Sequence, residues 1–196
     1  MGNQPQGVEN RDMQQDVAEK FRIVFGMDET PETLGEWADN TVQILKDRGT
    51  SVGFEEMCTT GSSRHGVYAN GEVQHFRCVL DTLLYPFVLD EEDIEVRSRS
   101  PVSDEVIEVS VSQGDVSVEP EGAVMSFGIA AGARSAEEHE DPLEYGYRMY
   151  CPYINAFVDE EEYEEWASNT PDGVTMSVPL REGFELARIL GENLAE

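Results

Sequence analysis

Apolar residues recur at helical spacing in two segments near the start of the chain, residues 12–25 and 31–47. The second segment follows Thr30, a residue type that caps helices, and Pro31 suits the first helical position. We therefore predict two helices there. A Gly/Ser/Thr-rich linker is expected over residues 50–63.

Strand and helix patterns are mixed in the rest of the chain. Asn70-Gly71 lies between two short strand-like runs, which is the strongest short signal for a hairpin. Strands are predicted at residues 66–70, 72–77, 106–111, 115–119, 123–130, 147–158 and 174–178. Helices are predicted at residues 78–88, 159–167 and 180–194. The polar, acidic segment 133–144 is expected to be a surface loop.

These elements indicate an α+β fold, in which a short helical region precedes a body of mixed or antiparallel sheet with flanking helices. We expect residues 1–10 to form a flexible tail and residues 11–63 to form the N-terminal helical region with its linker. Residues 64–196 are then the main domain. A chain of 196 residues is long enough to bury a substantial core.

Acidic residues dominate the charge of the chain. Asp and Glu number 41 against 13 Lys and Arg, which gives a formal net charge of −28. Because the acids are spread along the whole chain, they indicate a solvated surface coat suited to a salt-rich cytoplasm, and an acidic binding protein is the lesser interpretation. The absence of a basic stripe argues against nucleic acid and anionic membranes as partners.

The cysteine count and the N-terminus favour a cytoplasmic protein. Three cysteines cannot all pair, and the first residues lack the apolar core of a secretion signal. No apolar run approaches the ~20 residues that a membrane helix needs. We therefore expect free thiols in a reducing compartment.

Cys78 and Asp81 form the first candidate site. At positions i and i+3 of the predicted helix, the thiol and the carboxylate share one face. Unpaired backbone N–H groups at a helix N-terminus favour a thiolate, and a carboxyl group in an apolar segment is suited to carry a proton. On spacing alone, a packed core cysteine with Asp81 bonded to nearby backbone is the favoured interpretation, because Cys is often buried and Cys-x-x-Asp is a weak pattern.

Cys151 lies in a segment rich in aromatic residues, which are Tyr145, Tyr147, Tyr150, Tyr153 and Phe157. A buried thiol with no chemical role is the simplest interpretation. The alternative is an aromatic pocket that holds an apolar ligand beside the sulfur. A zinc site from Cys58, His65, His75 and Cys78 has enough ligands, but its spacings match no compact zinc motif.

The segment from His75 to Pro86, HFRCVLDTLLYP, resembles the organomercurial (alkylmercury) lyase family, which carries a Cys-x-x-Asp-Thr-Leu core followed closely by proline. Further similar segments follow in family order over roughly residues 64–190, including Cys151 with Glu165-Trp166-Ala167-Ser168 beyond it. The acidic composition suggests a halophilic, archaeal-type member. In the family, the N-terminal region is winged-helix-like, and here it is reduced.

The resemblance implies that Cys78, Asp81 and Cys151 are catalytic and contact the mercury of an organomercurial substrate. Two thiolates bind mercury, the aspartate protonates the departing carbon, and a hydrocarbon and Hg(II) result. No organic cofactor or permanent metal is implied, and Hg(II) passes to a small thiol or a mercuric reductase. The alternatives are a non-enzymatic thiol-based metal carrier on the same scaffold and a DNA-binding mercury sensor, which the net charge opposes.

Three positions depart from the family pattern. Arg77 stands where relatives can carry an aromatic residue, and Pro152 stands where some have another cysteine. Ser100 aligns with a family cysteine that is regarded as structural. These differences concern the lining of the pocket and stability, and they leave the three implied catalytic residues in place.

The acidic coat makes stability depend on salt. Self-repulsion among the carboxylates is screened at high ionic strength, so Tm should rise between dilute buffer and multimolar KCl. Thermal unfolding followed by circular dichroism measures this shift. A Tm that is the same in both solutions would contradict the interpretation of the acidic surface.

Overall fold

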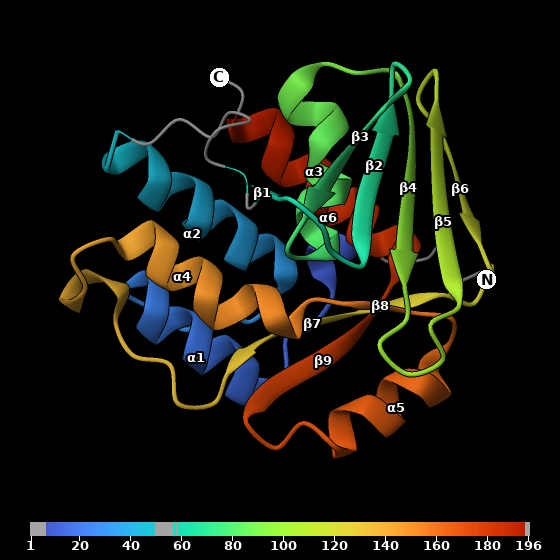
Figure 1. The fold of residues 1–196 in the computed structure, drawn as a ribbon. Coiled ribbons are helices and arrows are strands. Elements are labelled where there is room, and N and C mark those ends of the chain that lie inside the picture. The colour runs from blue at the N-terminus through green and yellow to red at the C-terminus, as the bar shows by residue number, and fades with distance from the viewer. Residues whose placement is uncertain (1–6, 50–56, 58, 195–196) are drawn as a thin grey trace, which may run out of the picture.

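The computed structural model describes residues 7–49, 57 and 59–194. It confirms the predicted α+β class, because these residues form two antiparallel sheets with helices packed around them (Figure 1). None of the helices in the described part is long and apolar enough to cross a membrane. One hydrophobic core extends from Val8 to Leu194, so the N-terminal helices and the body pack as one unit.

The N-terminal elements are the 3-10 helix η1 (Val8–Asn10) and the helices α1 (Gln15–Phe25) and α2 (Leu34–Asp47). Both predicted helices are present, but the cap of α2 is Thr33, whose side chain accepts a hydrogen bond from the Glu36 backbone N–H. Thr30 donates to the Glu19 carboxylate on α1 instead. Val8, which lies in the segment expected to be a tail, is buried in the core.

The larger sheet has the strand order β1-β3-β2-β4-β5-β6. Its strands are β1 (Thr59–Thr60), β2 (His65–Ala69), β3 (Glu72–Phe76), β4 (Asp93–Arg99), β5 (Val106–Ser112) and β6 (Asp115–Glu119). The predicted hairpin is confirmed at Asn70 and Gly71, which both have positive φ, as a two-residue turn of this kind requires. β4 was missed by the pattern analysis, and Cys58 lies outside the described residues.

Two helices cover one face of this sheet. They are α3 (Val79–Leu89) and α6 (Leu180–Leu194), which pack against each other, and α3 also contacts β2, β3 and β4. Every second residue of β4 and β5 is buried, which is the pattern of a sheet with one covered face. The positions of both helices agree with the prediction.

The smaller sheet has the order β8-β7-β9, with β7 (Val124–Ala130), β8 (Ala156–Phe157) and β9 (Gly173–Pro179). Its central strand is buried on both faces. Val124 packs with Phe157 and Tyr163 under the helix α5 (Glu160–Ser168), whereas Met125, on the opposite face, belongs to the main core. Figure 1 shows α5 on the outer side of this sheet.

The prediction of one strand over residues 147–158 is wrong. The segment holds the end of helix α4 (Pro142–Tyr150), the 3-10 helix η4 (Cys151–Tyr153) and only then β8. Asp141 caps α4 by accepting the Glu144 N–H, and Pro152 has no N–H to continue it. The predicted loop 133–144 likewise contains the 3-10 helix η3 (Ala136–Glu138) and the start of α4.

His65 lies in the core where β2 pairs with β4. Its Nδ1 is 2.9 Å from Ser98 Oγ, and its side chain is 2% exposed. Burial disfavours the imidazolium and lowers the pKa of His65 to about 4; a hydrogen bond with Asn155 acts in the opposite direction, and the charge of Arg64 lowers the pKa further. The native state therefore holds a neutral imidazole.

His65 should make stability depend on pH. Between pH 4 and 6.5 the unfolded chain binds a proton at His65 that the native state does not. The free energy of unfolding is therefore highest above pH 6.5 and decreases as the pH falls toward 4, by about 3 kcal/mol across this interval. Chemical denaturation at several pH values measures it, with His65→Gln expected to remove this part of the slope.

Ser98→Ala is the control. It removes the hydrogen-bond partner and leaves the burial of His65, which is the larger cause, so most of the slope should remain. A His65→Gln protein with the native slope would show that another group is responsible.

Candidate functional site

Cys78 is the N-cap residue of α3. Its backbone is extended, with φ −138° and ψ 162°, and its side chain makes no capping hydrogen bond. Cys78 therefore lies at the positive end of the helix dipole, which favours a thiolate. It is fully buried.

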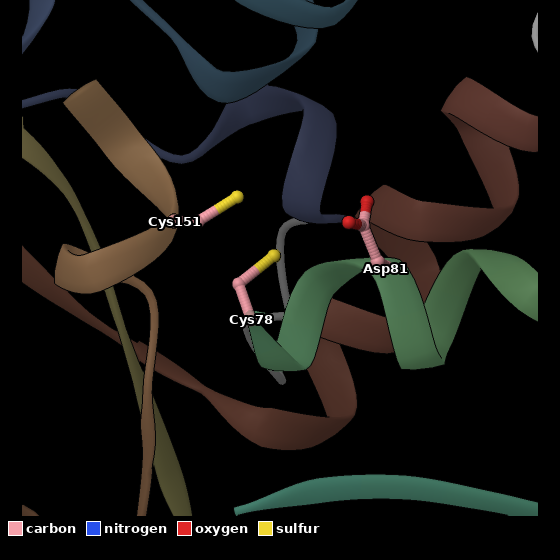
Figure 2. A group of neighbouring side chains, drawn as sticks. All are labelled: Cys78, Asp81 and Cys151. Carbon is pink, nitrogen blue, oxygen red and sulfur yellow. The ribbon is translucent and has the colours of Figure 1, made fainter. Parts of the chain in front are cut away.

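Asp81 lies in the first turn of the same helix. The predicted i, i+3 relation holds, and Figure 2 shows the Asp81 carboxylate on the side of α3 that also carries the Cys78 sulfur. Its side chain is 6% exposed between the buried residues Leu80 and Thr82. The Thr82 hydroxyl donates a hydrogen bond to the Val79 carbonyl at 2.5 Å.

Cys151 reaches the site from the turn between α4 and β8. The helix α4 ends at Tyr150, and Cys151 is its C-cap, whose N–H donates to the Tyr147 carbonyl. Cys151 is also the first residue of η4, followed by Pro152. The Val79 N–H then donates to the Ile154 carbonyl at 3.2 Å, which fastens this turn to the start of α3.

Ser126 on β7 supports the same turn. The Asn155 N–H donates to Ser126 Oγ at 2.9 Å, and the Ser126 N–H donates to the Asn155 carbonyl at 2.9 Å. Asn155 Nδ2 also donates to the Pro152 carbonyl. The position of the turn is thus set by the smaller sheet as well as by α3.

The structure brings the three candidate residues together. One sulfur atom each from Cys78 and Cys151 and one Asp81 oxygen lie within 4.8 Å of one another (Figure 2). All three residues are buried. Two soft sulfur ligands suit a thiophilic metal, and the carboxyl group next to them can carry a proton.

A cavity of about 80 Å³ adjoins this cluster and includes Asp81 in its wall. Tyr147 and Tyr150 line it, as the aromatic pattern suggested, whereas Tyr145, Tyr153 and Phe157 are not among its lining residues. Helices distant in sequence supply other parts of the wall, with Phe21 on α1, Trp37 and Thr41 on α2 and Leu190 on α6. The sequence analysis missed these residues, because only tertiary packing places them beside Asp81.

The Tyr150 hydroxyl stays protonated. Burial raises its pKa well above the usual value for tyrosine, and the neighbouring Tyr147, Cys151, Asp81 and Cys78 raise it further. Tyr150 therefore offers a neutral O–H group at the edge of the site.

The alternative zinc set is not assembled among the described residues. His65 bonds Ser98, and the cluster around Cys78 contains Asp81 and Cys151 but neither His65 nor His75. Cys58 is outside the described part of the chain, so its contribution to that set stays a prediction.

Two of the departures from the family pattern have structural partners. Arg77 forms an ion pair with Glu144 on α4 at 3.1 Å, which links the residue before Cys78 to the helix that ends at Cys151. Ser100 is fully buried, and its hydroxyl donates to the Glu162 carboxylate on α5 at 2.6 Å. Both contacts lie in the scaffold around the cluster.

Comparison with known proteins agrees with this geometry. The mercury-bound form of MerB2 has a similar fold, with a TM-score of 0.54 and 17% sequence identity over 95% of each chain. No curated protein matches the chain. The sequence profile of alkylmercury lyases matches residues 58–192, which is more than half of the chain and includes all three clustered residues. The chain therefore belongs to the alkylmercury lyase family.

Proposed function

We propose that this protein cleaves the carbon–mercury bond of organomercurials by protonolysis and releases a hydrocarbon and Hg(II). The observation that carries the proposal is the buried cluster of Cys78, Cys151 and Asp81, within 4.8 Å, in a member of the alkylmercury lyase family. The thiols suit mercury, and the carboxyl group is the proton donor that carbon requires.

The first step is ligand exchange at mercury. One cysteine thiolate displaces X⁻ from R–Hg–X and forms an S–Hg–R adduct. The position of Cys78 at the N-terminus of α3 favours its thiolate, and the burial of the cluster keeps water away from the adduct.

The second step breaks the carbon–mercury bond. The remaining thiol gives its proton to Asp81, and its sulfur forms a second bond to mercury. The electron pair of the Hg–C bond then takes the proton from Asp81, so that R–H leaves and mercury stays as Hg(II) on two thiolates. Mercury is Hg(II) throughout, so the step needs no oxidant, reductant or organic cofactor.

Release of Hg(II) requires another thiol pair. Because both sulfur atoms are buried, we propose stepwise exchange with a small thiol or with the thiols of a mercuric reductase. Mercury here is part of the substrate and the product. The protein is proposed to act in the cytoplasm, where thiols are reduced.

Asp81→Asn should separate binding from cleavage. The amide keeps the shape of the side chain but cannot deliver the proton, so hydrocarbon release should fall by at least about 100-fold, the usual contribution of a general acid. Binding of Hg(II) should persist, because both thiols remain. The measurements are gas chromatography of benzene from phenylmercury, with excess small thiol, and titration with Hg(II).

Asp93→Asn, on β4, is the matched control and should keep the native rate. The same assays test the non-enzymatic carrier. Tight binding of Hg(II) with no benzene from the native protein would support the carrier and contradict the proposal.

Each cysteine of the cluster should be required for cleavage. Cys78→Ala and Cys151→Ala each leave one sulfur, which cannot complete the two-thiolate product, so benzene release should be lost. Cys58→Ala removes the cysteine to which the family resemblance assigns no role, and it should stay active. Native activity in either cluster variant would overturn the assignment of the site.

A further inference from the structure

Four buried polar residues are linked by hydrogen bonds beside the turn that carries Cys151. His65 lies on β2 and Ser98 on β4, both in the larger sheet. Ser126 lies on β7 of the smaller sheet, and Asn155 lies between η4 and β8. Each of the four residues is at most 9% exposed. Polar groups removed from water are costly unless they are hydrogen-bonded, so a buried set of this kind calls for an explanation.

Asn155 is at the centre of these contacts. Its backbone N–H donates to Ser126 Oγ and its carbonyl accepts the Ser126 N–H, both at 2.9 Å. Its side-chain nitrogen donates to the carbonyl of Pro152, the residue after Cys151, at 2.9 Å. The same side chain is hydrogen-bonded to His65. Ser126 therefore fixes the backbone of Asn155, whereas the Asn155 side chain connects the turn to His65.

The hydrogen bonds assign the protonated nitrogen of His65. Because Asn155 Nδ2 donates to Pro152, the Asn155 amide oxygen is the atom that accepts from the imidazole. This contact acts to raise the pKa of His65, as an acceptor does. Nδ1 of the ring is 2.9 Å from Ser98 Oγ. Nε2 therefore carries the proton and donates to Asn155, and Nδ1 accepts from the Ser98 hydroxyl.

The two ends of this connection differ in rigidity. His65 lies opposite Ser98 in the antiparallel pairing of β2 with β4, and a side chain on a strand holds its place more precisely than one on a loop. The turn that begins at Cys151 is a 3-10 helix of three residues, whose internal hydrogen bonding is weak. The turn therefore depends on outside contacts for its position, and His65 supplies one from the larger sheet.

We propose that His65 is a positioning residue for the reaction, and that through the Asn155 amide it holds the Cys151 sulfur where it can share mercury with Cys78. The inference rests on the proposed function, in which both thiolates bind mercury before the carbon leaves. An adduct with one thiolate does not require this alignment, but the two-thiolate state does. Misplacement of a reacting group by about 1 Å costs up to about 100-fold in rate. Loss of the contact should therefore lower kcat with little change in KM.

His65→Asn and His65→Gln are a matched pair of variants that test this link. The Gln side chain is long enough to place its amide nitrogen near the position of Nε2, whereas the shorter Asn side chain places its amide near Nδ1. His65→Gln thus keeps the donor to Asn155, and His65→Asn loses it. For benzene release from phenylmercury, His65→Asn should lower kcat about tenfold, the size of one hydrogen bond, and His65→Gln should keep the native kcat.

Retention of Hg(II) gives a readout that does not require cleavage. In competition with a small thiol, His65→Asn should lose Hg(II) at about a tenfold lower thiol concentration than the native protein, because its two sulfur atoms are less well aligned. His65→Gln should retain Hg(II) as the native protein does. Equal kcat and equal retention of Hg(II) in the two variants would overturn the inference.

Asn155→Ala tests the same link from its other end. It should lower kcat and Hg(II) retention as His65→Asn does, and the double variant should lose no more than either single one, since both remove one connection. Native behaviour of Asn155→Ala would overturn the inference, even where His65→Asn does not fold.

The tautomer of His65 separates this inference from the proposed function. Nitrogen-15 NMR of the native protein should show a proton on Nε2 and none on Nδ1, and the reverse assignment would overturn the inference. Absence of benzene from the native protein would reject the lyase activity. In that case Hg(II) retention and the ring tautomer would still decide whether His65 positions Cys151.

Discussion

The hydrogen bond from the Val79 N–H to the Ile154 carbonyl joins the two parts of the chain that build the site. On one side of it, α3 begins and carries Cys78 and Asp81. On the other, the turn after α4 carries Cys151, held to β7 through Ser126. Because this bond is made by backbone groups in a buried region, it also satisfies an N–H at the helix start that lacks an intrahelical partner. The geometry of the cluster depends on both anchors.

The cluster is buried in a protein whose surface is strongly acidic. The formal net charge of −28 opposes the approach of anions, and the cluster itself holds a carboxyl group next to two thiols. The N-terminus of α3 offsets part of the negative charge at the cluster, because its backbone N–H groups favour negative charge. The neutral organomercurial proposed as substrate suits such a site.

The N-terminal helices are part of the site as well as of the fold. Phe21 on α1 stacks on Phe127 of β7, and Trp37 on α2 meets both rings, so these helices are fixed to the smaller sheet. From there α2 extends across the cavity beside Asp81 and supplies Trp37 and Thr41 to its wall. The N-terminal helices thereby contribute to the wall of the cavity beside Asp81.

Local sequence determined most elements, because hydrophobic periodicity and turn chemistry act over a few residues. It predicted the hairpin at Asn70-Gly71, the helix after Cys78, and the position of Cys78 and Asp81 on one face of that helix. The family resemblance added Cys151. Only the tertiary structure decided that Cys151 sits on a helical turn and that α2 lines the cavity. Both follow from contacts between segments far apart in sequence, whose energies no local pattern records.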